Sequence, residues 1–163
     1  MKVVEHNLQQ LQLLSTLLLQ VEPEHYCQIK PWPGQPSVGK HIRHVLDHYQ
    51  QLQLASHSKQ LDYRLRSRDK DVENEPAKAL YLIAHLTSWL RNLKTTDLDS
   101  TLSYQPAEGV TYTSLQRELD FVASHSVHHL ALIHALLEQW DYAWPDSAGV
   151  HSSTVEYQKR CAP

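Results

Sequence analysis

Histidines gather in two short stretches of the sequence, and their spacing predicts a metal site. The chain has twelve histidines. His125 and His129 are four residues apart, so on a helix both imidazoles project from one face and can chelate one ion. In the other stretch, His41, His44 and His48 share one helical stripe with His44 at its centre. We therefore predict that His44, His125 and His129 bind a divalent metal, leaving a coordination position for water or substrate.

The same spacing leaves a second ligand set open. His44 and His48 are four residues apart and could form their own chelate against that helix. His128 is next to a predicted ligand, so it points about 100° away around the helix, towards the rim. Glu118 shares a face with His125 and could orient a ligand or act as a base, although helix capping is the favoured interpretation. The side chains expected around the ion or at its rim are His41, His48, Glu118 and His128.

Four stretches of helical periodicity must position these residues. Leucine, isoleucine and valine recur every three or four residues, with glutamine and charged side chains between them. The chain has only four glycines, which also favours helices over many short strands. We expect helices from Val3 to about Gln20, from 37 to about 57, from near Pro76 to Leu93, and from Ser114 to about Gln139. The sequence thus predicts an all-α fold, a single four-helix bundle domain over residues 1–163.

The segments between these helices differ in composition. Residues 23–36 are rich in proline and predict a connecting loop, whereas 62–71 are dense in charge and suit a surface crossover. Threonine, serine and tyrosine alternate within 97–113 and predict a short β-hairpin. The tail from Asp141 looks irregular. A sequential up-down-up-down order is the simplest, and the long first loop leaves a crossed order open.

Composition argues against several classes of protein. The formal net charge is -3 and no long basic run occurs, so a nucleic-acid-binding role is not expected. The longest apolar run near the start, residues 17–19, is too short for a signal-peptide core or a membrane span. Cys27 and Cys161 lie far apart and outside any CxxC spacing, which does not suggest a disulfide scaffold. We expect a cytoplasmic protein with no membrane partner.

The histidine stretches resemble those of the DinB-like metalloprotein family. The similarity rests on SVGKHIRHVLDHY at 37–49 and SHSVHHLALI at 124–133, and it extends over nearly the whole chain. Members have one histidine in the second helix and an HxxxH pair in the last, which match His44 and His125 with His129. The resemblance implies a DinB/YfiT-like bundle with right-handed, crossed connections. It also implies a homodimer and a zinc, nickel or similar ion at one open end of the bundle.

The resemblance implies a class of chemistry without a substrate. Characterised relatives include transferases and isomerases that use bacillithiol or mycothiol, so we expect a metal-dependent transferase or hydrolase for a small molecule, perhaps with a low-molecular-weight thiol. The alternative is a non-catalytic metal-binding or stress-related helical interaction protein. Many relatives have a glutamine where this chain has Leu132 and Ile133. Tyr63, Arg64 and Arg66 accompany the histidines in one branch, and such arginines could hold an acidic group, although solvated charge is the favoured interpretation.

Overall fold

Four long helices form the body of the protein. The computed structural model describes residues 1–28, 36–145 and 148–161. The long helices are α1 (Lys2–Leu18), α3 (Val38–Ser58), α5 (Pro76–Asn92) and α7 (Leu115–Leu137). Ser37 and Ser114 cap α3 and α7, since each hydroxyl accepts a backbone N–H of the first turn. The four predicted helices are confirmed, with their ends within a few residues of the expected ones.

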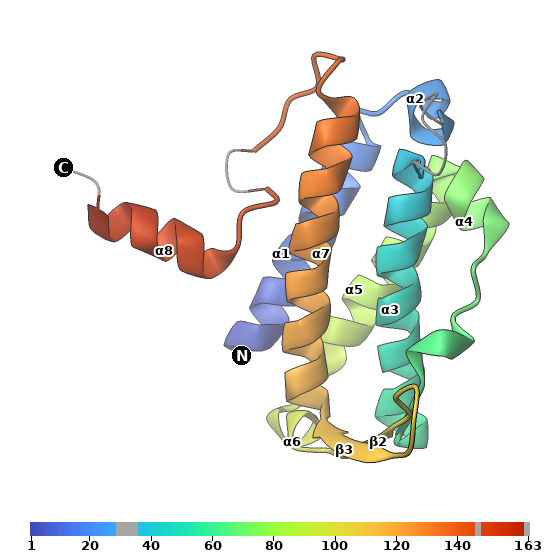
Figure 1. The fold of residues 1–163 in the computed structure, drawn as a ribbon, viewed down its shortest axis with the longest axis vertical. Coiled ribbons are helices and arrows are strands. Elements are labelled where there is room, and N and C mark those ends of the chain that lie inside the picture. Colours follow the sequence, from blue (N-terminus) through green and yellow to red (C-terminus); the bar gives the residue numbers. More distant parts are fainter. Residues whose placement is uncertain (29–35, 146–147, 162–163) are drawn as a thin grey trace.

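The order of the helices around the bundle is crossed, as the family resemblance implies, so the simplest predicted connectivity is wrong. α1 and α3 each pack against both α5 and α7, which places α1 opposite α3. Figure 1 shows α1 and α7 running upward and α3 and α5 running downward. The chain between 58 and 76 returns from the bottom of α3 to the top of α5. An extended segment of this length easily spans a helix of about 30 Å, and this makes the parallel arrangement possible.

The return segment carries several short elements. It contains β1 (Gln60–Leu61), the 3₁₀ turn η1 (Tyr63–Leu65) and α4 (Lys70–Asn74). After α5 and the short α6 (Thr95–Leu98), the strands β2 (Thr101–Tyr104) and β3 (Thr111–Ser114) form the predicted hairpin, with Thr101 opposite Ser114. β1 pairs in parallel with β2, which completes a small three-stranded sheet beneath the bundle in Figure 1.

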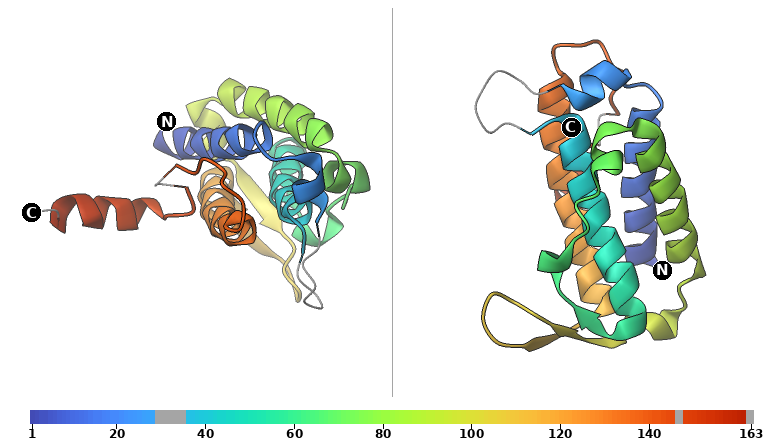
Figure 2. Two further views of the ribbon diagram at one scale, coloured as in Figure 1. Left: turned by 90° about the horizontal axis from the view of Figure 1, so that it is seen from above. Right: turned by 90° about the vertical axis from the view of Figure 1, so that its right-hand side faces the viewer.

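Two predictions about irregular segments need correction. The stretch 23–36 was expected to be a loop, but it contains α2 (Pro23–Cys27), whose proline at the first helical position is preset for a helix. Residues 29–35 of that stretch lie outside the described residues. The tail contains α8 (Ser152–Cys161), with basic residues in its last turn, where they favour a helix C-terminus. Figure 2 shows α8 extending away from the four-helix body.

A continuous apolar core fills the space between the four long helices. It includes fully buried leucines and isoleucines from each of them: Leu11, Leu14, Ile42, Leu46, Leu86, Leu90, Leu119, Leu130 and Ile133. Within the described ranges, none of the helices combines the length and apolar character that crossing a bilayer requires. The core fixes α3 directly against α7, and these are the two helices that carry the histidine stretches.

Candidate metal centre

His44 and His125 meet across the interface between α3 and α7. Their Nε2 atoms are 3.1 Å apart, and their ring centroids are 5.0 Å apart. The ring of His48 lies 4.6 Å from that of His44 and 4.5 Å from that of His125. One nitrogen from each of these three imidazoles falls within 4.8 Å of the other two. The two histidine stretches therefore converge on one place in the fold.

His129 lies in the same cluster, with one ring nitrogen turned towards another histidine. Its ring centroid is 4.7 Å from that of His44 and 4.5 Å from that of His125. Its Nδ1 is 2.9 Å from Nδ1 of His41, so one of these two nitrogens donates an N–H to the other. The structure thus brings all three predicted ligands together, and it brings the competing His48 in with them. The choice between His48 and His129 as third ligand stays a prediction.

The backbone of α3 holds His48 in one tautomer. His48 Nδ1 lies 2.8 Å from the carbonyl oxygen of His44, one turn earlier, and must donate its N–H to that acceptor. The lone pair of the neutral ring is then on Nε2. Arg66 Nη1 lies 3.4 Å from this Nε2. A guanidinium therefore faces the nitrogen with which His48 would bind an ion.

The histidines of the cluster favour the uncharged form. Burial is the largest cause that lowers the pKa of His44 to about 4, and the neighbouring His125 lowers it further. Burial likewise lowers the pKa of His48 to about 3 and that of His129 to about 3. The pKa values of His41 and His125 are also lowered, again mainly by burial. Near neutral pH these rings are uncharged and offer lone pairs, which is the form that ligates metals.

The cluster extends from the middle of α3 and α7 towards one end of the bundle. His48 and His125 are near the midpoints of these helices, and His44 and His129 lie one turn nearer the start of α3 and the end of α7, so the open-end location implied by the family resemblance stays a prediction. Phe121 stacks on His125 with 18° between the rings, and Tyr63 lies 4.9 Å from His48. These aromatic rings border the cluster on one side. His128 is exposed on α7, as expected for a residue at the rim.

Glu118 does not cap α7, so the favoured interpretation of this residue is wrong. Ser114 already caps the helix through the N–H of Arg117. The Glu118 carboxylate is buried and accepts hydrogen bonds from the Tyr63 hydroxyl at 2.9 Å and the Thr113 hydroxyl at 2.8 Å. Arg117 also donates to it. Glu118 therefore ties the return segment and β3 to α7, and it reaches the histidines only through Tyr63.

A family model described as the DinB superfamily matches residues 7–133. The chain belongs to the DinB superfamily. The crystal structure of a DinB-like protein from Bacillus subtilis, YjoA, is similar with a TM-score of 0.69 and 15% identity, covering 89% of this chain and 96% of that chain. At this identity the likeness supports the fold alone. No curated protein matches the sequence.

Arg64 and Arg66 lie in different environments in this DinB chain. Arg64 is exposed and pairs with Asp62 at 2.7 Å, which agrees with the interpretation of solvated charge. Arg66 is half-buried beside His48, so that interpretation does not hold for it. Sequence reasoning missed Asp47 and Gln51, which hold the residues on either side of Arg66. Asp47 and Gln51 lie close to His48 in the sequence of α3, and this proximity could have indicated that they contribute to the surroundings of the histidines.

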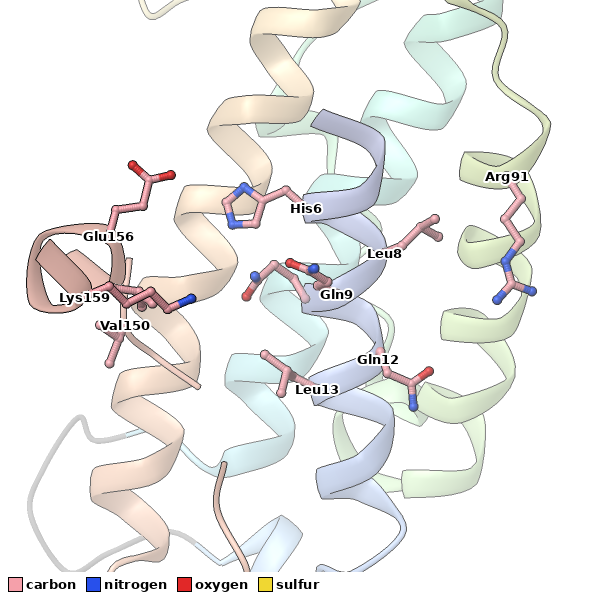
Figure 3. A pocket seen from close by; sticks show the side chains of 11 residues that line it. His6, Leu8, Gln9, Gln12, Leu13, Arg91, Val150, Glu156 and Lys159 are labelled. Carbon is pink, nitrogen blue, oxygen red and sulfur yellow. The ribbon is translucent and has the colours of Figure 1, made fainter. Parts of the chain in front are cut away.

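A groove of about 650 Å³ lies on another side of this DinB bundle. Figure 3 shows His6, Gln9 and Leu13 of α1 on its floor, with Glu156 and Lys159 of α8 on one side. The histidine cluster is not part of it. Most of its lining consists of scattered amide and apolar side chains, which do not form a set of metal ligands or an acid–base pair. We therefore assign the candidate site to the histidines and not to this groove.

Proposed function

We propose that this DinB superfamily chain binds one divalent ion, zinc or nickel, through His44, His125 and His129, and acts as a metal-dependent transferase or hydrolase on a small molecule. The observation that carries the proposal is the clustering of uncharged imidazoles from α3 and α7. Nitrogens of His44, His48 and His125 lie within 4.8 Å of one another, and the ring centroid of His129 is 4.7 Å from that of His44 and 4.5 Å from that of His125. Imidazole nitrogens without a carboxylate among them suit zinc or nickel better than magnesium or calcium.

The surroundings of the two candidate third ligands favour His129. His48 Nε2 faces the Arg66 guanidinium, which competes with a cation for the same lone pair. His129 instead has His41 at its Nδ1. When His129 donates this N–H to His41, its Nε2 lone pair is free, and a ligating histidine typically donates its other ring N–H to an acceptor in this way.

Three neutral ligands leave the ion its full charge and an open position. Such an ion acts as a Lewis acid and lowers the pKa of a water or thiol that it binds. The chain itself contributes the orientation of the His129 ring through His41 and the apolar shielding of His125 through Phe121. We propose a low-molecular-weight thiol as the cofactor or second substrate. The homodimeric state and the cytoplasmic location stay predictions.

Metal content of purified protein tests the proposal. We expect about one zinc or nickel ion per chain in the wild type, and loss of the ion in His44→Ala and in His125→Ala. His128→Ala is the matched control, because this exposed histidine lies between the predicted ligands on α7. A wild-type protein that binds no ion under metal-replete conditions would overturn the proposal.

Cobalt substitution then distinguishes a catalytic ion from a structural one. The absorption bands of cobalt report its coordination number and respond to an added exogenous ligand. An open position predicts that azide shifts these bands. A closed site with no response, combined with a large loss of stability on chelation, would instead favour the non-catalytic alternative.

A further inference from the structure

The Arg66 guanidinium borders the histidine cluster and has no carboxylate partner among the residues that the structure describes. None of the ion pairs among the described residues includes Arg66. Its Nη1 lies 3.4 Å from Nε2 of His48, and its Nε is buried without a hydrogen-bond partner. Asp47 acts on Arg66 through its charge but is not in ion-pair contact with it. A desolvated donor of this kind normally has an acceptor, and none of the described residues supplies one for Nε.

The chain on both sides of Arg66 is tethered to α3. The Gln51 side chain donates to the carbonyl oxygen of Leu65 at 3.2 Å. The Ser67 hydroxyl donates to Asp47 Oδ1 at 3.0 Å, and Asp47 is only 2% exposed. Asp47 and Gln51 flank His48 on α3, so the two tethers hold Arg66 directly beside this histidine. The position of the guanidinium is therefore built into the fold.

The backbone after Arg66 adopts a conformation that residues other than glycine seldom use. Arg68 has a φ of 52°, in the left-handed region. The residue before it, Ser67, is held by the Asp47 carboxylate. Strained residues that the surrounding structure holds in place are enriched at ligand sites. The turn at Arg68 thus directly follows the segment that is tethered to α3.

We propose that Arg66 is the anion-binding residue of this site and holds the carboxylate of a small-molecule thiol whose sulfur reaches the metal ion. This inference rests on the proposed function, because it needs the ion. A divalent ion held by neutral histidines and a nearby guanidinium are both positive, and an anion between them offsets their repulsion. The guanidinium fork also matches a carboxylate in geometry. The substrate class is therefore an acidic thiol and not a neutral one.

Two small thiols test this assignment on cobalt-loaded protein. Mercaptoacetate and 2-mercaptoethanol both offer a thiol that binds as thiolate, with its proton released to the buffer, but only mercaptoacetate carries a carboxylate. Binding is followed by the cobalt–thiolate absorption band. We expect wild type to bind mercaptoacetate about tenfold more tightly than 2-mercaptoethanol, as one charge-assisted contact would provide.

Arg66 variants separate anion binding from a structural role. Arg66→Gln keeps an N–H donor for His48 but loses the charge, so the preference for mercaptoacetate should disappear while 2-mercaptoethanol binding is unchanged. Arg66→Lys should restore part of the preference. Arg64→Gln is the matched control, because Arg64 is exposed and paired with Asp62, and it should behave as wild type.

The outcomes distinguish this inference from the proposed function. If cobalt binds normally but the two thiols bind equally well, or Arg66→Gln weakens both thiols to the same degree, the anion assignment is wrong and metal binding stands. If wild type shows no cobalt bands, the proposed function fails and this inference fails with it.

Discussion

The hydroxyl of Tyr63 donates a hydrogen bond to Glu118 Oε2 at 2.9 Å, and this contact joins the return segment to α7. Both residues are buried. The Tyr63 ring also lies 4.9 Å from His48 and 5.7 Å from Phe121. A burial-driven rise in the pKa of Tyr63, to which Glu118 adds, keeps the hydroxyl protonated and able to donate. The buried Tyr63–Glu118 pair thus holds the Tyr63 ring in place beside His48 and Phe121.

Removing this hydroxyl should destabilise the fold without removing the metal. In Tyr63→Phe, the Glu118 carboxylate keeps Thr113 and Arg117 as donors but loses the buried one. We expect a loss of about 1 to 2 kcal/mol and a melting temperature lower by roughly 2 to 6 °C. Thermal denaturation measures this, with Tyr81→Phe as control because Tyr81 is 78% exposed. Equal melting temperatures for the two variants would contradict the role assigned to the pair.

Alanine variants of the two competing ligands should behave differently. We expect His129→Ala to weaken metal binding at least about a hundredfold, whereas His48→Ala keeps about one ion per chain. Competition with a chromophoric chelator measures both affinities. The reverse result would show that His44, His48 and His125, the three whose nitrogens already lie within 4.8 Å, form the ligand set.

The metal-free protein should lose stability on mild acidification. The folded-state pKa values of His44 (about 4), His48 (about 3) and His129 (about 3) lie below the ordinary value of 6.5. Between pH 7 and 5 the unfolded chain therefore binds more protons than the folded chain, and stability falls as the pH falls.

Thermal denaturation in the presence of a chelator measures this slope. We expect the melting temperature to drop by about 5 to 10 °C from pH 7 to pH 5. His48→Gln should show a shallower slope, since one of the histidines with a lowered pKa is gone. A profile that is flat over this range, or one that rises towards acid, is incompatible with buried neutral histidines.

Gly39 should not tolerate a methyl group. A Cβ at this position would overlap the carbonyl oxygen of Glu73 and lie 2.6 Å from a ring carbon of Tyr26, where α2 and α4 approach α3. At an open helical site, replacing glycine by alanine stabilises a helix by about 1 kcal/mol. A loss of stability in Gly39→Ala would therefore show that the steric overlap outweighs this helix preference. We expect Gly39→Ala to destabilise by about 2 kcal/mol in a denaturant titration. An increase in stability would show that α4 moves away freely.

Periodicity was enough to predict the long helices and the pairing of their histidines, because apolar spacing determines which face of each helix is buried. It could not predict that α3 and α5 run in the same direction, since each helix pattern is the same whichever neighbour covers it. Glu118 was misassigned because a capping glutamate and a buried acceptor near a helix start look alike in sequence. Arg66 was undervalued because its burial depends on tethers from Asp47 and Gln51 that no local pattern reveals.

The parallel course of α3 and α5 in Figure 1 obliges the chain to travel back along the bundle, and on this course it places Tyr63 and Arg66 beside His48. The helices that carry the histidines and the return segment that carries Arg66 are therefore separate stretches of the sequence. Under the proposed role of Arg66, a substitution at this residue changes which small molecules bind, whereas Tyr63 in the same segment also supports the fold through Glu118. The proposal therefore makes Arg66 the position at which an engineer would begin to change selectivity.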